Sequence, residues 1–499
     1  MAATQAPRNM ERPCFHLLAV LLLVLVLLLP SKHHEGALAA TVQPTTSLEA
    51  QAAALLRWKS TLTISSSTSP LSTWSPSVHP CNWTGVTCHI IGRRNQGLAI
   101  SEVDLKSAGL DWRLDTLSFL SLPFLTKLDI SDNKQLSGSV PPSIGSLAML
   151  STLNFSSNQL TGSIPAKVGE LQSLTVLDLS FNSLTGTIPP SMTNLTMLRD
   201  VRLFTNQLSG PIPDELGKLV NLVNLEFDDN LLTGSIPSSI TNLSKLVHLG
   251  LSNNLLSGSI PKEIGNLRNL IFLMISKNNF AGNLPSTIAN LTKLQLLGAN
   301  RCNLSGHLPE QIGHLTGLRE IYLYSNQLTG SIPPTFGNLR RLSFLYLYEN
   351  KLSGSIPYEL GRSVPQSFGS LKNMEVLILF GNKLSGPLPQ TLSNLTNLVD
   401  VELSYNYFSG HLPDFCNGGK LQWFSATTNH FSGSFPRSFK DCSSLIILDI
   451  MGNQMDGDIT EALGVYPNLE FAGLNSNKLQ CQLSPNWGSC RGYLLKLAS

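Results

Sequence analysis

Four tyrosines recur at one interval in the middle of the chain: Tyr322 and Tyr324 form the first pair, and Tyr346 and Tyr348 form the second. Within each pair the rings alternate with aliphatic residues, so on a β-strand they project from one face. Large aromatic side chains with few rotatable bonds are effective anchors for a bound ligand. The spacing therefore indicates binding chemistry rather than catalysis.

Neighbouring segments extend this group of rings into a patch. Residues separated by the same interval should lie on adjacent strands, about 4.8 Å from one another, and a contiguous exposed patch usually marks an interaction site. The side chains predicted to bind an extended peptide are Phe272, Met274, Glu320, Tyr322, Tyr324, Phe344, Tyr346, Tyr348 and Phe380. Arg202, Lys277 and Arg301 are candidates for holding a carboxylate of that peptide. The alternative is that cross-strand stacking only stabilises the sheet, at about 0.2–1 kcal/mol per pair.

No catalytic constellation accompanies the patch, and no cofactor or metal is expected. The ten histidines are scattered without metal-ligand spacing. Glu226, Asp228 and Asp229 form one acidic group, which is either solvated surface or part of an electrostatic ligand site. The net charge is only +2 and there is no Lys/Arg block, which argues against a nucleic-acid partner. We therefore expect a binding protein that is not an enzyme.

The elements that must position the patch follow from a repeat. The segment Leu174–Leu195 has the frame L-x-x-L-x-L-x-x-N-x-L-x-G-x-I-P, which returns at a constant interval, at Leu198, Leu222, Leu246 and Leu270. A period of roughly 24 residues predicts a solenoid, because one repeat cannot bury its apolar face alone. We predict an α/β right-handed solenoid with a concave parallel sheet, short 3₁₀ or helical returns on the convex side, and an N-terminal helical cap. Asn182 should satisfy turn backbone groups with its amide.

The frame asparagine defines the register of the array. Its successive positions are Asn133, Asn158, Asn182, Asn206, Asn230, Asn254, Asn278, Cys302, Asn326, Asn350, Asn382, Asn406, Asn429, Asn453 and Asn477. The step from Asn350 to Asn382 is longer than any other, so we expect a local bulge there. With a degenerate first copy this makes about sixteen repeats over residues 98–492, irregular at 358–373, followed by a tail at 493–499.

The N-terminal region divides into two parts. Residues 1–39 have the basic start, short apolar run and A-x-A site of a secretory signal peptide; a signal anchor is the alternative. Residues 40–97 are predicted to form an N-terminal cap. In it, Ser47 caps a helix over 47–62 and Cys81 and Cys88 close a short loop.

The cap and the array together resemble the ectodomain of plant leucine-rich-repeat receptor-like kinases, in particular those that perceive secreted peptides in development or defence signalling. The resemblance implies a secreted peptide or protein ligand, a co-receptor leucine-rich-repeat kinase, and an extracellular location, in the apoplast or at the plasma membrane if a full-length receptor exists. The family continues with a membrane helix and a Ser/Thr kinase domain, whose motifs are missing here. Two alternatives stay open: a secreted inhibitor of a cell-wall-degrading glycanase, and a truncated, non-functional receptor product.

Oxidation and glycosylation sites follow from the secretory route. We expect disulfides Cys81–Cys88 and Cys416–Cys442, with Cys481–Cys490 as a weaker third pair and Cys302 as a buried free thiol. The N-x-S/T sequons are Asn82, Asn154, Asn194, Asn242, Asn290, Asn303 and Asn394. Asn194, Asn242, Asn290 and Asn394 share one place in the repeat, always at the same distance after a frame asparagine, so their glycans should line one flank. Asn154 should face the concave side.

Overall fold

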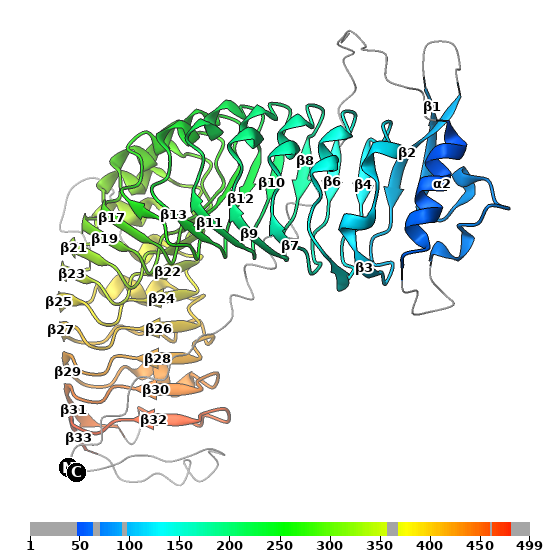
Figure 1. The fold of residues 1–499 in the computed structure, drawn as a ribbon. Helices are drawn as coiled ribbons and strands as arrows, with labels where there is room; N and C mark the ends of the chain where they lie inside the picture. Colours follow the sequence, from blue (N-terminus) through cyan, green and yellow to red (C-terminus); the bar gives the residue numbers. More distant parts are fainter. Residues whose placement is uncertain (1–46, 63–69, 92–96, 357–367, 460–461, 481–499) are drawn as a thin grey trace, which may run out of the picture. The chain divides into compact units, whose positions relative to one another are not determined.

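The computed structural model describes residues 47–62, 70–91, 97–356, 368–459 and 462–480. The expected signal peptide, the tail and the pair Cys481–Cys490 lie outside these residues. The described residues belong to one compact unit, in which successive repeats follow one another in the order of the sequence (Figure 1).

A main sheet of seventeen strands runs through the described part of the chain. Its first strand, β1 (Val86–Ile90), pairs antiparallel with β2, and every later pair is parallel. The parallel strands are β2 (Leu98–Asp104), β4 (Lys127–Asp129), β6 (Thr152–Asn154), β8 (Val176–Asp178), β10 (Asp200–Arg202), β12 (Asn224–Glu226), β14 (His248–Gly250), β16 (Phe272–Met274), β18 (Leu296–Gly298), β20 (Glu320–Tyr322), β22 (Phe344–Tyr346), β24 (Val376–Ile378), β26 (Asp400–Glu402), β28 (Trp423–Ser425), β30 (Ile447–Asp449) and β32 (Phe471–Gly473).

A second set of short parallel strands follows the frame asparagines and forms a side layer. These strands are β3 (Asp111–Arg113) with β5 (Gln135–Ser137); β7 (Thr161–Ser163), β9 (Ser183–Thr187), β11 (Gln207–Pro211) and β13 (Leu231–Thr233); and β15 (Ser257–Gly258), β17 (Asn279–Asn283), β19 (Asn303–His307), β21 (Gln327–Gly330), β23 (Lys351–Gly354), β25 (Lys383–Pro387), β27 (Tyr407–Gly410), β29 (His430–Gly433), β31 (Gln454–Asp458) and β33 (Lys478–Gln480).

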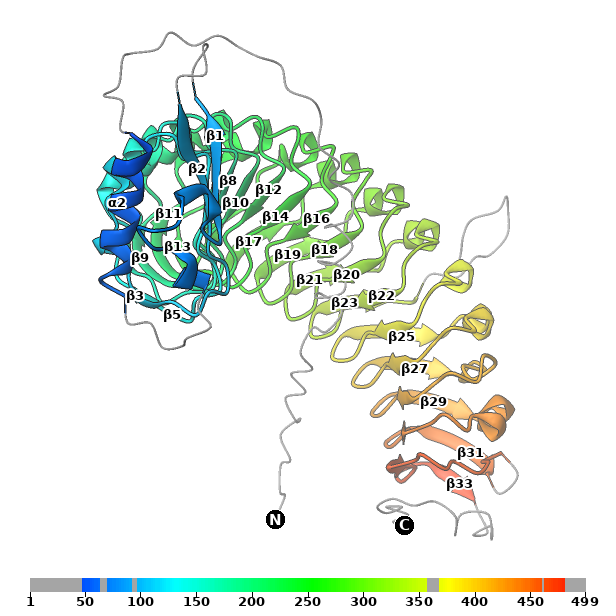
Figure 2. The same cartoon turned by 90° about the vertical axis from the view of Figure 1, so that its right-hand side faces the viewer.

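Short 3₁₀ helices carry the chain back to the next strand of the main sheet, on the side opposite its outward face (Figure 2). They are η3 (Leu114–Thr116), η4 (Phe119–Ser121), η5 (Pro142–Ser146), η6 (Ala166–Glu170), η7 (Pro190–Asn194), η8 (Asp214–Lys218), η9 (Ser238–Asn242), η10 (Ile264–Asn266), η11 (Ser286–Asn290), η12 (Glu310–His314), η13 (Pro334–Asn338), η14 (Phe368–Ser370), η15 (Gln390–Asn394) and η16 (Arg437–Asp441). Two further 3₁₀ helices, η1 (Pro70–Thr73) and η2 (Pro80–Asn82), precede the first strand and belong to the N-terminal region. Parallel sheet and short returns confirm the predicted solenoid.

Each repeat buries the apolar positions of the frame. Leu177 on β8, Leu179 directly after that strand and Leu195 on the return are fully buried, and the same positions of other repeats join them in one continuous core. Each buried aliphatic side chain contributes about 1.5–3 kcal/mol relative to exposure. Because neighbouring repeats share this core, the strands are stable only as a stack.

The frame asparagines form a buried ladder beside the core. Asn326 donates from Nδ2 to the carbonyl oxygens of Leu323 and Ala299, at 3.0 and 2.9 Å, and its Oδ1 accepts from the Leu304 amide at 3.1 Å. The amide thus links two adjacent repeats, which confirms the predicted role. Cys302 takes one ladder position as a buried free thiol, with Sγ 3.5 Å from the Ile275 carbonyl oxygen. Burial raises the pKa of this thiol to about 11, so it is unreactive.

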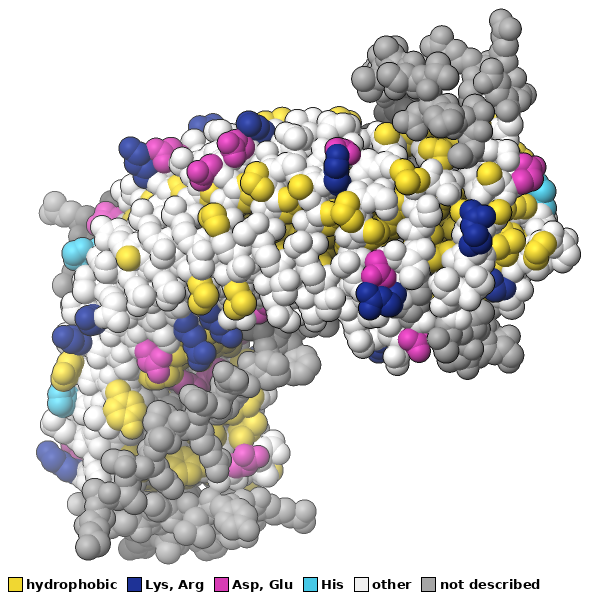
Figure 3. Space-filling view, viewed as in Figure 1, with side chains coloured by type: hydrophobic (Ala, Val, Ile, Leu, Met, Phe, Trp, Pro, Cys, Tyr) yellow, Lys and Arg dark blue, Asp and Glu magenta, His cyan; other side chains and the backbone are white. Residues whose placement is uncertain are grey.

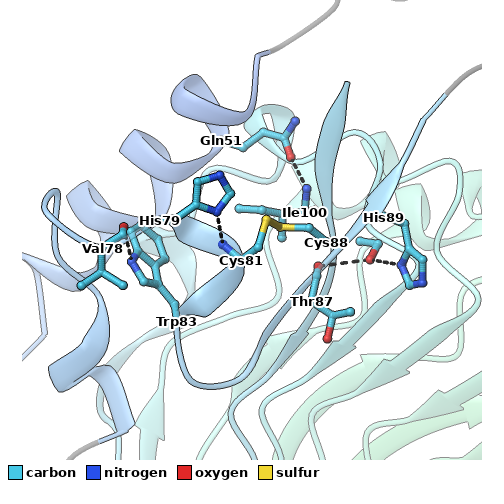
Figure 4. Close-up of a disulfide and its surroundings, with 10 residues drawn as sticks. Gln51, Val78, His79, Cys81, Trp83, Thr87, Cys88, His89 and Ile100 are labelled. Carbon is cyan, nitrogen blue, oxygen red and sulfur yellow. Dashed lines mark hydrogen bonds between the residues drawn. A yellow bond between two sulfur atoms is a disulfide. The ribbon is translucent and has the colours of Figure 1, made fainter. Parts of the chain in front are cut away.

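The N-terminal cap covers the first edge of the stack. Helix α2 (Leu48–Lys59) begins after Ser47, whose Oγ accepts from the Ala50 amide at 3.3 Å, as the sequence predicts. Gln51 is fully buried and its Oε1 accepts from the Ile100 amide at 2.9 Å, which joins the helix to β2 (Figure 4). Cys81 and Cys88 are disulfide-bonded beside this contact.

Two features stabilise the later repeats. Cys416 and Cys442, from adjacent repeats, are disulfide-bonded with their Cα atoms 5.8 Å apart. The main sheet also continues across the long step between Asn350 and Asn382, because Phe344 pairs with Val376 and Tyr346 with Ile378. The extra residues at 357–367 lie outside the described residues, so the predicted bulge stays a prediction.

Glycines in several returns allow neighbouring 3₁₀ helices to approach closely, which gives a test of the stack. A Cβ on Gly265 would collide with the carbonyl oxygen of Thr287 in the next return. We expect Gly265→Ala to lower the free energy of unfolding by about 1–3 kcal/mol through overpacking. The matched control is Ala289→Gly, at the equivalent place one repeat later, which should cost about 0.5–1 kcal/mol. Urea unfolding of both variants measures the difference; a neutral Gly265→Ala would contradict the close packing.

Candidate ligand-binding surface

The outward side chains of the main sheet form one surface, which we call the sheet face. Because its strands pair in parallel and in register, equivalent residues of successive repeats lie side by side. Glu320 is opposite Phe344, Tyr322 is opposite Tyr346, and Tyr346 is opposite Ile378. Residues that are separated by the constant interval in the sequence are therefore neighbours in a row across the sheet.

Five rings on this face form an aromatic cluster, which consists of Tyr322, Tyr324, Tyr346, Tyr348 and Phe380. The ring centroids of Tyr324 and Tyr348 are 4.3 Å apart with planes at 9°, and those of Tyr348 and Phe380 are 4.6 Å apart at 15°. Tyr322 and Tyr346 are 5.0 Å apart and tilted by 30°. All five side chains are half-buried. Each ring therefore has one face or edge against its neighbour and another part accessible.

The hydroxyl groups of the cluster are hydrogen-bonding groups. Tyr322 Oη donates to Glu320 Oε2 at 2.7 Å. Burial raises the pKa of Tyr348 well above its usual range, and the charge of Arg301 opposes this shift only weakly. Glu320, which the sequence places on the exposed patch, is in fact buried, because the tyrosine and the neighbouring strands cover it. The cluster therefore presents rings and phenol groups rather than a free carboxylate.

One of the three predicted cations, Arg301, lies near the cluster, since its charge acts on Tyr348. Lys277 and Arg301 are exposed and occupy equivalent places in adjacent repeats, with φ of 52° and 50°. This left-handed backbone turns the chain from the main sheet towards the side layer. The two cations are therefore at one edge of the sheet face, Arg301 in the repeat before Tyr324 and Lys277 one repeat earlier.

Arg202 does not join this group, contrary to the prediction from the sequence. It lies on β10, five strands before β20 in the sheet and thus about 24 Å away. Its guanidinium also contacts carboxylates of the same chain: Nη2 is 3.3 Å from Asp200 Oδ1 and Nε is 3.4 Å from Glu226 Oε1. Arg202 is thus neutralised internally and is not available to a ligand carboxylate beside the tyrosines.

Phe272 and Met274 are separated from the aromatic cluster as well. Gly298 lies between Met274 and Tyr322 in the sheet, and the buried Leu296 lies between Phe272 and Glu320. Phe272 is only 8% exposed and packs edge-on against His248, with centroids 5.6 Å apart. Phe344 is half-buried beside Glu320. The predicted patch therefore divides into the aromatic cluster and a flatter surface around Met274.

The acidic group is solvated surface only in part, because Asp229 is exposed, Asp228 is half-buried and Glu226 is buried. Glu226 is 6% exposed and lies 3.4 Å from His248 Nδ1 as well as from Arg202. Burial opposes its ionisation, but the hydrogen bonds and charges of His248 and Arg202 outweigh burial and lower the pKa of Glu226. This buried network fixes the side chains of β10, β12 and β14 on the sheet face.

Asp228 is held differently from Glu226. Its carboxyl group extends over Gly250, whose missing side chain leaves the space, and its Oδ1 accepts from the Ser252 amide at 2.7 Å. Burial raises the pKa of Asp228 to about 6, because one amide and the charge of His248 compensate desolvation only in part. Asp228 therefore changes its charge within the mildly acidic range.

Several outward apolar side chains of the surface were not predicted from the sequence. Trp423, Ile447 and Phe471 are half-buried and continue the row of Phe344 along later strands. Phe181 is 50% exposed and stacks edge-on with Phe204 at 4.9 Å. The same alternation that identifies Tyr346 applies to Trp423, so this signal was present in the sequence.

The remaining surface is mostly uncharged. On the side drawn in Figure 3, charged side chains of both signs are sparse and stand singly or in small mixed groups on a largely uncharged surface. Among the described residues, no three or more His, Cys, Asp or Glu side chains are grouped so that they could hold a metal ion. A search of the same residues finds no helix with the length and apolar character needed to cross a bilayer.

Comparison with family models places this architecture among known proteins. Residues 230–489 match the model of the leucine-rich repeat region, residues 48–89 match the leucine-rich-repeat N-terminal domain, and residues 124–147, 149–171 and 173–195 match single leucine-rich repeats. Among curated proteins of Arabidopsis thaliana, the LRR receptor-like serine/threonine-protein kinase RGI3 is 40% identical over 111 residues, which are 22% of this chain and 9% of that protein. MDIS1-interacting receptor like kinase 2 is 40% identical over 153 residues, which are 30% of this chain and 12% of that protein.

Solved structures give longer matches. The plant peptide hormone receptor RGFR1, solved in complex with RGF2, is 35% identical with a TM-score of 0.74, and the match covers 82% of this chain and 62% of that one. The TDR receptor is 30% identical with a TM-score of 0.63, covering 73% of this chain and 67% of that one. The chain thus spans about a tenth of the two curated kinases and about two thirds of these receptor structures.

Proposed function

The chain belongs to the leucine-rich-repeat family, and we propose that it binds an extended secreted peptide on its sheet face, as the ectodomain part of a receptor-like kinase does. The observation that carries this proposal is the aromatic cluster, whose stacked and half-buried rings span three neighbouring strands. The similarity to RGFR1, a receptor solved with its peptide hormone, supports it.

The arrangement of the cluster suits a peptide in extended conformation. The rings of Tyr324, Tyr348 and Phe380 form a row across the strands, so a chain lying along this row meets a ring at each repeat, about every 4.8 Å. Tyrosine combines a large apolar area with a hydroxyl group for the peptide backbone. Lys277 and Arg301, beyond the edge of the row, supply positive charge for a carboxylate of the same ligand.

The proposed setting is the extracellular space, with a co-receptor leucine-rich-repeat kinase as a second partner. The curated relatives are receptor kinases, and the secretory signal expected over 1–39 and the disulfides suit an oxidising compartment. The kinase activity of those relatives is not assigned to this chain, because the matches cover small parts of them.

The experiment uses the secreted chain on beads and the peptide fraction of plant apoplastic fluid. Retained peptides are eluted, identified by mass spectrometry, synthesised and titrated calorimetrically against the purified chain. We expect at least one peptide that binds with one-to-one stoichiometry. Retention of an intact glycanase with no retained peptide would instead support the inhibitor alternative and overturn this proposal.

A further inference from the structure

Four of the sequons lie at one structural position on the return side of the solenoid. Asn194, Asn242, Asn290 and Asn394 are each the last residue of a 3₁₀ helix, namely η7, η9, η11 and η15. All four are exposed, and in the described part of the chain their amides make no side-chain hydrogen bond. The next residue is a buried leucine in every case, which anchors the backbone so that the asparagine points outward.

The hydroxyl residue of each of these sequons is exposed too. It is Thr196, Ser244, Thr292 or Thr396, two positions after the asparagine. A sugar attached at any of the four amides would therefore extend into solvent without displacing a contact of the fold. N-linked glycans are bulky and occupy surface positions of this kind.

The spacing of the four asparagines also leaves room for the sugars. Between η7 and η11 a sequon occurs on every second return, and the intervening positions hold Lys218 and Asn266. Adjacent repeats are about 4.8 Å apart, so Asn194, Asn242 and Asn290 are separated by about 10 Å. Asn266 is exposed, but Arg268 stands where a sequon needs Ser or Thr.

Asn154 is the opposite case. It lies on β6 in the sheet face, where Nδ2 donates to Asp129 Oδ2 at 3.2 Å and Oδ1 accepts from Ser156 Oγ at 2.8 Å. Its neighbours across the sheet are Asp129 and Asp178. A glycan on Nδ2 would break the bond to Asp129 and crowd both carboxylates. Chains modified there would fold poorly and be retained by quality control.

We propose that Asn194, Asn242, Asn290 and Asn394 carry N-linked oligosaccharides, that secreted Asn154 does not, and that the resulting glycan row keeps protein partners off the return side. In the transfer, the amide Nδ2 bonds to the anomeric carbon of a lipid-linked oligosaccharide pyrophosphate. The bond from that carbon to the pyrophosphate oxygen breaks, Nδ2 loses a proton, and the lipid pyrophosphate leaves. The inference rests on the extracellular location in the proposed function and adds that the sheet face remains open to a ligand.

The test is site-specific glycopeptide mass spectrometry of the full chain, expressed in plant cells with its own leader and analysed in both medium and cells. We expect glycans at the four aligned asparagines and an unmodified Asn154 in the secreted protein. An unmodified member of the row, or a glycan on secreted Asn154, would overturn the proposal. If the chain stays in the cells without any glycan, the proposal and the extracellular location both fail. If it is secreted with the row unmodified, only the glycan proposal fails.

A gain-of-site variant provides the matched control. Arg268→Thr converts Asn266-Leu-Arg into a sequon at the same structural position, one repeat after Asn242. We expect one additional glycan, removable by peptide N-glycosidase, with unchanged secretion and unchanged affinity for the peptide found above. Arg268→Ala makes no sequon and should gain no mass from glycan. An Arg268→Thr chain that remains unmodified, or that loses its peptide affinity, would show that this position does not accept sugars as proposed.

Discussion

Replacing both Tyr324 and Tyr348 with alanine is expected to weaken peptide binding about 100-fold. The ring centroids of these two residues are 4.3 Å apart, so their loss removes two of the three rings in the proposed contact row. Interface side chains that matter cost more than about 1 kcal/mol each when truncated, and two losses of about 1.4 kcal/mol each give about 2.8 kcal/mol, which corresponds to 100-fold. Calorimetric titration with the identified peptide measures the change.

Two controls separate binding from folding in this experiment. Tyr324→Phe with Tyr348→Phe keeps both rings and should retain most of the affinity. Tyr407→Ala removes a ring that is 54% exposed but lies on β27 of the side layer, so affinity should not change. If the double alanine variant is folded by circular dichroism and binds like the wild type, the stacking serves only the sheet, at about 0.2–1 kcal/mol per pair.

Asp228→Asn is expected to stabilise the protein near neutral pH by about 3 kcal/mol, since two pKa units correspond to about that free energy. The pKa of Asp228 rises from 3.8 to about 6 on folding, so the folded state holds an extra proton between these pH values. The contribution of Asp228 to the free energy of unfolding is therefore fully present below about pH 4. It decreases as the pH rises to about 6 and stays low above that pH. Asparagine mimics the protonated acid and keeps an acceptor for the Ser252 amide.

The measurement is urea unfolding of both proteins at pH 4, 5, 6 and 7.5. The difference in the free energy of unfolding between the variant and the wild type should be small at pH 4 and increase to a plateau above pH 6. Glu226 and His248, whose charges act on Asp228, are present in both proteins. Asp229→Asn, at the exposed neighbour, is the control and should show no such trend. A difference in the free energy of unfolding that is the same at every pH would refute the raised pKa of the Asp228 carboxyl group.

The sequence determined the architecture of this protein through its period. A frame that repeats at a constant interval places each leucine against its counterpart in the next repeat and each asparagine in a ladder, so Leu177, Leu179 and Asn326 could be assigned to core and ladder without coordinates. The stacking of Tyr324 on Tyr348 follows from the same period, because in-register parallel strands turn a sequence interval into a spatial neighbour.

Only the tertiary structure decided how each outward side chain is used. The alternation of residues along a strand predicts to which face a side chain points, but not how far neighbouring side chains cover it. It therefore could not show that Glu320 and Phe272 are buried or that Gly298 interrupts the patch. It also could not show that Arg202 is neutralised by Asp200 and Glu226, since these contacts join side chains of neighbouring strands. Burial and charge pairing depend on side chains from several repeats at once, and they are fixed only when the stack brings those side chains together.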